Sequence, residues 1–490
     1  MGNIYFPQAS QGKNRIKMHP GMSILEAAQL AGLTIGATCA GMGKCGRCKV
    51  TIENGQENLN LPTNIEKSFR LAEKERLACQ ARIMRDVSDL IVHIKHLEEY
   101  EILKYGTKRK LAIHPLYKNE NGKVFRGQIP IEDYRGAIYG LAVDIGTTTV
   151  VLDLVNLENG EILGTIAKTN PQISYGSDVI SRIRFIYPGK KNDKYFDQQE
   201  SVKRLKILQN LISALINSAV KELSKTMGKD IKNSIYYTVI AGNSVMRDIF
   251  FGLDVSSLGV SPYEPSDKSP ITTCPVTTGL EINSAGEVYG IPLIGGHIGG
   301  DTVAGILACE MCRKKDICLL IDIGTNGEIV LGNKDRLIAL SCAAGGAFEG
   351  TAVGCGTGSI PGAIKQIELT DEKISYTTIG NKRPVGICGS GLIDLLAELL
   401  QHGIMTKTAK ITQDFYITQT IRLTQTDIYQ LITAKAAVRT GWQVLLKQYP
   451  AQLSDVKNIY ISGGFGNFIN IKNAITIGLI PDVENQKVVK

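Results

Sequence analysis

Four cysteines near the start of the chain have the type and spacing of iron ligands. Cys39, Cys45 and Cys48 stand on one glycine-rich loop with five and two residues between them, and Cys79 follows after thirty more. A 2Fe-2S cluster needs this arrangement, because each iron takes two sulfur ligands and the loop must wrap around the cluster. Zinc is the alternative, since the Cys-x2-Cys pair alone would suit it. Zinc sites rarely use a three-cysteine, glycine-rich loop, so the pattern favours iron–sulfur.

Two aspartates stand at matching places in a repeated pattern. Asp144 lies in 141–154, LAVDIGTTTVVLDL, and Asp322 lies in 319–333, LLIDIGTNGEIVLGN. Each copy is an apolar run, an aspartate, a Gly-Thr turn and a second apolar run, the pattern of a β-hairpin with a polar tip. An ordinary tight turn would explain one copy, but two copies at domain-scale separation predict a nucleotide site. A carboxylate at the end of a buried strand suits hydrated Mg²⁺.

The tips of both hairpins are expected to hold phosphate, because glycine lets successive backbone N–H groups turn toward an anion. The residues expected to do so are Gly146, Thr147, Thr148, Gly324, Thr325, Asn326 and Gly327. Later glycine-rich turns between strands and helices would admit an anion or an adenosine closely; these are Gly389, Ser390, Gly391, Gly463, Gly464 and Gly466. Asp301 follows another such turn, and it either positions the attacking water or, as the stronger expectation, caps the next helix.

Composition narrows the class of protein. The 490 residues are 43% hydrophobic and 21% charged, and no apolar run approaches the ~18 residues of a membrane span. The first residues lack the pattern of a secretory signal, so we expect a soluble, cytoplasmic protein. A net charge of +8 without a basic, aromatic-interleaved run or a recognisable motif argues against nucleic-acid binding. Eleven cysteines in such a chain indicate metal or redox use rather than disulfides.

Periodicity predicts the elements that must position these residues. Short strands at Asn3–Phe6 and Asn14–Met18 and a helix capped by Ser23 precede the cysteine loop. The segment 97–137 has no sustained apolar period and predicts a connector with one small strand pair. Strands and helices then alternate. The expected elements are the two hairpins, a helix after Ser177, an amphipathic helix at Ser201–Leu223, a strand at Ile235–Ala241, helices at Thr302–Met311 and Leu392–Leu400, and a strand at Asn458–Ile461.

The N-terminal part resembles the plant-type and adrenodoxin-type ferredoxin domains. The resemblance covers about Asn3–Ile94 and includes the stretch Arg76–Gln80 around the last cysteine. The first gap between the cysteines has five residues where the plant-type spacing has four, which favours the adrenodoxin-like branch. The resemblance implies a β-grasp fold around a 2Fe-2S cluster.

The remainder resembles the superfamily of acetate and sugar kinases, actin and heat-shock ATPases, over about Ile138–Pro481. The order of phosphate hairpin, long connection, second hairpin and glycine-rich adenosine loop carries this resemblance. Within the superfamily, several short sequence motifs resemble those of the reductive activators of corrinoid proteins. These motifs start at Leu141, Ala241, Gly300, Ile321 and Phe348. The implied fold is α/β: a ferredoxin-like domain at 1–96, a linker at 97–137, and a two-lobed ATP-binding domain at 138–490 with a shorter C-terminus than is usual.

The resemblance implies ATP-dependent transfer of one electron from the cluster to Co(II) of a corrinoid methyl-transfer protein, with ATP and Mg²⁺ between the lobes. Asp144, Asp301 and Asp322 would be the catalytic carboxylates. The implied partners are the corrinoid protein of a methyltransferase system and a low-potential electron donor, and a homodimer is compatible with the sequence. Two alternatives remain: a small-molecule kinase with a fused regulatory cluster, and an ATP-independent ferredoxin-type electron carrier.

Three further cysteines, Cys309, Cys312 and Cys318, could form a second cluster or a redox pair. The first two fall at the end of the helix expected at Thr302–Met311. Packing as small apolar residues is the stronger expectation for them.

Overall fold

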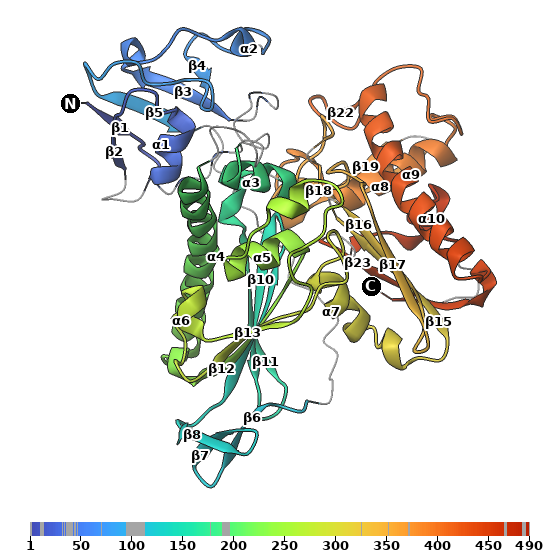
Figure 1. Ribbon diagram of the computed structural model, residues 1–490. Helices are drawn as coiled ribbons and strands as arrows, with labels where there is room; N and C mark the ends of the chain where they lie inside the picture. The colour runs from blue at the N-terminus through green and yellow to red at the C-terminus, as the bar shows by residue number, and fades with distance from the viewer. Residues whose placement is uncertain are drawn as a thin grey trace.

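The chain forms an N-terminal β-sheet domain followed by two lobes, each built on a sheet of its own (Figure 1). This computed structural model describes residues 2–9, 14–31, 33, 35, 43, 46, 48–69, 71–94, 113–176, 178–188, 197–324, 326–350, 352–370, 373–464, 468–482 and 487–489. Within those ranges, no helix has both the length and the apolar composition that crossing a membrane requires.

The N-terminal domain is a five-stranded mixed sheet in the order β2-β1-β5-β3-β4, in which β1 runs parallel to β5. Ser23 and Glu26 form a capping box at the start of the first helix, as expected from the sequence. The apolar face of that helix, with Ile24, Ala27 and Ala28, is buried in the domain core. Its elements are β1 (Asn3–Tyr5), β2 (Arg15–Lys17), α1 (Ile24–Leu30), β3 (Lys49–Asn54), α2 (Asn64–Lys67), β4 (Glu75–Leu77) and β5 (Leu90–Ile94).

Residues 113–137, directly before the first lobe, contain more secondary structure than the sequence indicated. In place of one small strand pair, they hold a three-stranded antiparallel sheet, β6 (Tyr117–Glu120), β7 (Lys123–Arg126) and β8 (Ile129–Asp133). Tyr117 is fully buried against Tyr236 of the lobe, with ring centroids 5.6 Å apart, and Arg126 pairs with Glu287 at 2.6 Å. The prediction failed because these strands are short and bury at most one residue each, which leaves no visible apolar period.

Lobe I is a six-stranded sheet in the order β11-β10-β9-β12-β14-β13, with α3, α4 and α5 contributing to its main core. The first predicted hairpin is β9–β10, and the long amphipathic helix is α4, which buries Leu208, Ile212 and Ile216. The lobe consists of β9 (Tyr139–Ile145), β10 (Thr149–Asn156), β11 (Ile162–Thr169), α3 (Val179–Ile186), α4 (Gln198–Met227), β12 (Ile235–Gly242), α5 (Ser244–Phe251), β13 (Ile271–Thr273), α6 (Pro275–Thr278) and β14 (Glu287–Gly290).

Lobe II repeats the same topology. Its sheet order is β17-β16-β15-β23-β24, so an antiparallel three-strand meander is again followed by parallel neighbours. The second predicted hairpin is β15–β16. The lobe consists of β15 (Ile317–Ile323), β16 (Gly327–Gly332), β17 (Leu337–Cys342), β18 (Ala363–Thr370), β19 (Lys373–Thr378), β20 (Gly386–Ile387), α8 (Gly389–Gln401), β21 (Phe415–Tyr416), β22 (Arg422–Leu423), α9 (Gln425–Gln448), β23 (Val456–Ser462), α10 (Ile471–Thr476) and β24 (Lys487–Val489).

The helix α7 (Gly300–Ala308) lies where the two lobes meet and contacts β12 of one and β15 of the other (Figure 1). A side chain at Gly299 would come within 2.5 Å of Asn243 Cα, so glycine permits this close approach. Short 3-10 helices complete the fold: η1 (Gln56–Asn58), η2 (Pro171–Tyr175), η3 (Lys232–Ser234), η4 (Ser256–Gly259), η5 (Met311–Arg313), η6 (Ile379–Asn381) and η7 (Leu453–Asp455). The fold predicted from the sequence is confirmed in both parts.

Candidate functional site

Carboxylates from both lobes gather where the lobes meet. Asp144 is the penultimate residue of β9 and Asp322 is the penultimate residue of β15, so the two copies of the fold present equivalent side chains. Asp301 comes from the first turn of α7. Gly299, not Asp301, occupies the cap position of that helix, so the expectation that Asp301 is the cap was wrong. The Asp301 carboxylate instead accepts the N–H of Thr302 at 2.7 Å.

The negative charges of these carboxylates raise one another's pKa values. The Asp144 side chain is exposed to solvent at the end of β9, and it is also surrounded by many protein atoms. Desolvation by these atoms, followed by the charges of Asp301 and Asp322, raises the pKa of Asp144 to about 7. Desolvation and the charge of Asp322 likewise raise the pKa of Asp301 to about 6. Desolvation also raises the pKa of Asp322, against the effect of a hydrogen bond with Ser462.

A fourth carboxylate, Glu328, belongs to this group and was not singled out from the sequence. It stands opposite Asp322 in the β15–β16 ladder, so both side chains lie on the same face of the hairpin. Desolvation, together with the charges of Asp322 and Asp301, raises the pKa of Glu328 well above its usual range, although Ser341 donates a hydrogen bond to it at 3.1 Å. Counting outward from the hairpin tip would have found it, since paired residues are equidistant from the tip. Lobe I has Val151 at the equivalent place.

The first predicted phosphate-binding turn, Gly146-Thr147-Thr148, joins β9 to β10 and begins two residues after Asp144. Asn243, at the turn between β12 and α5, donates to the Thr147 hydroxyl at 3.1 Å and caps α5 by accepting the N–H of Met246. A side chain at Gly146 would come within 2.6 Å of the Thr149 carbonyl. The tight turn therefore needs glycine here, and α5 and the turn hold one another in place.

In the second turn, the Gly324 N–H donates to the Asn326 carbonyl at 3.1 Å, and Gly327 begins β16. Thr325 lies outside the described residues. Gly463 follows β23 with a φ of 110°, and a side chain there would approach the Ile323 carbonyl to 2.2 Å. Gly463 is thus packed against the end of β15, directly before the second predicted phosphate-binding turn, as a nucleotide that contacts both would require. Gly466 also lies outside the described residues.

The third predicted loop has a packing role of its own. Gly389, Ser390 and Gly391 are buried at the start of α8. The Ser390 hydroxyl donates to the Lys365 carbonyl at 2.7 Å, and a side chain at Gly391 would come within 2.5 Å of the Ile364 carbonyl. Close packing of α8 on β18 accounts for these residue types without a ligand, so their contact with a nucleotide stays a prediction.

Two of the four predicted cluster ligands are described, and they lie together. The Sγ atoms of Cys48 and Cys79 are 3.4 Å apart and both side chains are buried. That separation is far longer than the ~2.05 Å of a disulfide and near the ~3.8 Å expected for two sulfurs about 2.3 Å from one tetrahedral metal. Hydrogen bonding from Cys48, and also from Gln80, lowers the pKa of Cys79 to about 6, which suits a thiolate ligand. Cys39 and Cys45 lie outside the described residues.

The three later cysteines do not lie on one helix. The helix α7 ends at Ala308, three residues earlier than expected, which leaves Cys309 as its C-cap and Cys312 on η5. Cys318 is buried in β15, but Cys312 is exposed, so the expectation that it packs inside was wrong. Among the described side chains, no group of three cysteine, histidine or acidic residues could hold a metal ion alone. A Mg²⁺ ion at the carboxylates would therefore complete its coordination with water and phosphate oxygens.

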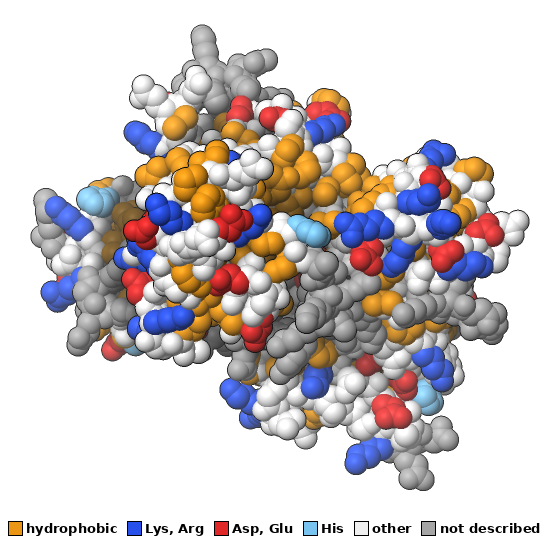
Figure 2. Space-filling model, turned by 90° about the horizontal axis from the view of Figure 1, so that it is seen from below, with side chains coloured by type: hydrophobic (Ala, Val, Ile, Leu, Met, Phe, Trp, Pro, Cys, Tyr) orange, Lys and Arg blue, Asp and Glu red, His pale blue; other side chains and the backbone are white. Residues whose placement is uncertain are grey.

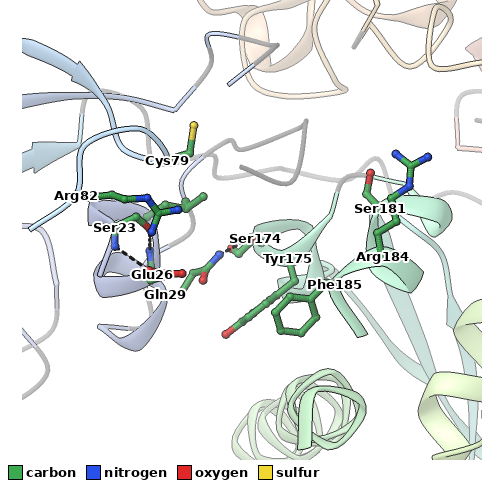
Figure 3. A pocket seen from close by; sticks show the side chains of 11 residues that line it. Ser23, Glu26, Gln29, Cys79, Arg82, Ser174, Tyr175, Ser181, Arg184 and Phe185 are labelled. Carbon is green, nitrogen blue, oxygen red and sulfur yellow. Dashed lines mark hydrogen bonds between the residues drawn. The ribbon is translucent and has the colours of Figure 1, made fainter. Parts of the chain in front are cut away.

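The N-terminal domain touches lobe I beside its predicted cluster site. The Gln29 amide, on α1, donates to the Ser174 carbonyl at the end of η2. A cavity of about 250 Å³ adjoins this contact, and side chains of both parts line it (Figure 3). Its lining includes Glu26, Arg82, Cys79, Tyr175, Arg184 and Phe185. On the face of the molecule in Figure 2, Lys and Arg are interspersed with Asp and Glu rather than gathered into a patch of one sign.

Comparison with known proteins gives three matches to family models. Residues 9–84 match the 2Fe-2S iron-sulfur cluster binding domain, 139–314 match the RACo middle region, and 316–490 match the C-terminal domain of RACo, the ASKHA domain. The chain is 31% identical to the corrinoid activation enzyme RamQ of Eubacterium limosum, over 92% of this chain and 85% of that one.

Two further matches are also to proteins that are named as acting on corrinoid proteins. The [Co(II) methylated amine-specific corrinoid protein] reductase of Methanosarcina barkeri is 25% identical, over 70% of this chain and 66% of that one. A solved structure titled reductive activator for corrinoid,iron-sulfur protein superposes with a TM-score of 0.67 at 29% identity, covering 100% of this chain and 90% of that one. The similarity thus extends over both the cluster-binding domain and the two lobes.

The first prediction concerns the metal in the N-terminal domain. Replacing Cys79 by Ser should remove most of the 2Fe-2S cluster, because one iron loses a thiolate. Replacing Cys312 by Ser should leave the cluster intact, since that exposed residue is on η5 of the other part of the chain. Iron, acid-labile sulfide and visible absorption of anaerobically purified protein measure the outcome. Stoichiometric zinc without sulfide in the wild type would contradict it.

The second prediction concerns pH and the crowded carboxylates. The pKa of Asp144 is about 7 in the folded protein and ordinary, near 4, in the unfolded chain, so the folded state holds an extra proton between these values. Stability should therefore fall as pH rises from about 4 to 7. Asp144→Asn should raise the unfolding temperature of metal-free protein at pH 8, by about 2–4 °C per kcal/mol of relieved repulsion and desolvation, and the gain should shrink toward pH 5.

Thermal unfolding in a chelator, followed at both pH values, measures this difference. Asp133→Asn, at an exposed aspartate on β8, is the matched control and should change little. An Asp144→Asn protein that is less stable than the wild type at pH 8 would show that the carboxylate is favourably solvated or paired.

Proposed function

The chain belongs to the family of reductive activators of corrinoid proteins, and from this we propose that it is an ATP-dependent activator which reduces cobalt in a corrinoid protein from Co(II) to Co(I). The observation that carries the proposal is the union, in one chain, of a 2Fe-2S binding domain with a pair of lobes whose carboxylates converge. Electron transfer and nucleotide hydrolysis are joined in one chain when one must drive the other.

The energetic need for ATP follows from the reaction. For transfer of one electron, each ~59 mV uphill lowers the equilibrium yield tenfold. A plant-type 2Fe-2S cluster, when bound, supplies electrons at about −400 mV, and reducing Co(II) of a corrinoid to Co(I) requires a lower potential still. Coupling to ATP can supply the difference by changing how the lobes close and how the corrinoid protein is held.

The residues of this chain suit that task. Asp144 and Asp322 approach from opposite lobes, with Asp301 between them on α7, so a Mg²⁺–nucleotide complex would contact both lobes at once. A divalent cation neutralises phosphate charge when bound there. The turns at Gly146 and Gly324 would hold phosphate, and Asp301 would position the attacking water. Closure of the lobes would follow from the repulsion among carboxylates and phosphates that the cation relieves.

We further propose that the corrinoid partner belongs to a methyltransferase system; the name of the Methanosarcina barkeri relative gives a methylated amine-specific corrinoid protein as the protein it reduces. A low-potential electron donor would resupply the electron after each turnover. The protein would act in the cytoplasm, where both partners would be present.

The third prediction separates the two activities. Asp322→Ala should lower ATP hydrolysis by at least about 10²-fold, because the phosphoryl charge loses a positioned cation, while the content of 2Fe-2S cluster stays unchanged. Cys79→Ser should do the reverse: little cluster, but hydrolysis retained. Phosphate release and cluster absorption of the same preparations measure both.

Full hydrolysis by Asp322→Ala would remove the lobes' carboxylates from the proposed mechanism. Acceleration of hydrolysis by an added sugar or small acid, with no response to a Co(II) corrinoid protein, would instead identify a small-molecule kinase.

A further inference from the structure

The segment Asn170–Gly176 connects two parts of the molecule that the proposed function must coordinate. It begins directly after β11, contains η2, and ends before α3. One end contacts the first phosphate-binding turn, and the other contacts the N-terminal domain. Asn170 and Gln172 are fully buried and Ser174 is nearly so. Buried polar side chains must be paired, so their contacts show what the segment holds.

Asn170 ties the segment to the phosphate-binding turn. Its side-chain amide donates to the Gly146 carbonyl at 2.8 Å, and its backbone N–H donates to the Thr148 carbonyl at 2.8 Å. Its side-chain oxygen accepts the N–H of Gln172 at 2.9 Å and so caps η2. One residue thus fixes the position of the turn relative to η2.

Arg182, on α3, adds a third tie. It is fully buried, and its guanidinium donates to the Thr147 carbonyl, to the Gln172 side chain at 3.0 Å and to the Gly176 carbonyl at 2.9 Å. Desolvation lowers the pKa of Arg182 to about 9, which still leaves it charged at neutral pH. Burying a charge costs free energy unless its N–H donors form hydrogen bonds. Here the hydrogen bonds of the guanidinium join the turn to both ends of η2.

These ties set the direction of the turn's N–H groups. Gly146, Thr147 and Thr148 all have their carbonyls bound by Asn170 or Arg182. In a trans peptide unit the C=O and the following N–H point in opposite directions. The N–H groups of Thr147 and Thr148 therefore point away from η2, as donors to a phosphate would. A phosphate that binds these N–H groups would shift the same peptide units, and with them the carbonyls to which Asn170 and Arg182 donate.

The other end of the segment, at Ser174 and Tyr175, contacts the N-terminal domain or lies beside that contact. The Ser174 carbonyl accepts the Gln29 amide of α1, and Tyr175 packs on Phe185 with ring centroids 4.7 Å apart (Figure 3). The adjoining cavity of about 250 Å³ includes Cys79, a predicted cluster ligand. Small contacts between domains are readily made and broken, and one hydrogen bond changes such an equilibrium by about two- to tenfold.

We propose that Asn170–Gly176 couples the nucleotide at the first phosphate-binding turn to the docking of the 2Fe-2S domain on lobe I. Asn170 and Arg182 are its positioning residues on the nucleotide side, and Gln29 is its contact on the domain side. The coupling rests on the proposed function insofar as it requires ATP at the turn. It gives ATP a route to the position of the cluster that needs no movement of lobe II.

Hydrogen–deuterium exchange of the cluster-loaded protein tests this, with and without a non-hydrolysable ATP analogue and Mg²⁺. Binding of the analogue, measured separately by titration, should change exchange at least twofold in peptides covering both 170–176 and 23–31. Gln29→Glu cannot donate to the Ser174 carbonyl, so it should keep analogue affinity and the response of 170–176 but lose the response of 23–31. Gln56→Glu, at an exposed glutamine of the same domain, is the matched control and should respond as the wild type does.

A wild-type protein that binds the analogue without any response at 23–31 would overturn the coupling alone. So would a full response of 23–31 in Gln29→Glu. Failure to bind the analogue at all would overturn the proposed ATP dependence and the coupling with it. Arg182→Lys, which keeps the charge but loses the planar fork, should weaken the response at both peptides.

Discussion

Crowding and desolvation of four acidic side chains where the lobes meet is the constraint on which the proposed nucleotide site depends. Asp144 belongs to lobe I, Asp322 and Glu328 belong to lobe II, and Asp301 comes from the helix between them. Packing of β9, β15 and α7 forces these groups together and raises their pKa values. A divalent cation bound there would offset the crowded negative charge, and the effect would be largest when carboxylates of both lobes contribute.

The proposed coupling would connect this carboxylate site to the cluster-binding domain through a buried polar segment. A nucleotide held at the carboxylates would contact the turn at Gly146, and Asn170 and Arg182 donate hydrogen bonds to carbonyls of that turn. Under the proposed coupling, displacements there would reach Ser174 and Gln29 through the hydrogen bonds of the segment. The proposed nucleotide site and the predicted cluster site would then lie at two ends of one network of contacts that joins lobe I to the N-terminal domain.

The sequence predicted those features that depend on local pattern. Both hairpins, the Ser23 cap and α4 follow from periodicity and residue type. The features that were missed depend on tertiary contacts. Asn170 and Arg182 look like ordinary polar residues in the sequence, and only their burial and contacts show what they bind. The sheet β6–β8 likewise packs on residues far away in the sequence, among them Tyr236 and Tyr237. Glu328 could have been predicted, because the residues that pair across a hairpin are equally far from its tip, and Glu328 pairs with Asp322. The roles assigned to the nucleotide-contacting glycines remain predictions.

Reduction of a Co(II) corrinoid protein, followed optically with and without ATP at matched cluster content, tests the central claim most directly. The wild type, supplied with a low-potential donor, should accumulate Co(I) when ATP and Mg²⁺ are present, and should yield at least tenfold less Co(I) when ATP is withheld, the penalty for each ~59 mV left uncompensated. Equal Co(I) yields under both conditions would contradict the account and show that the lobes have no part in driving the electron.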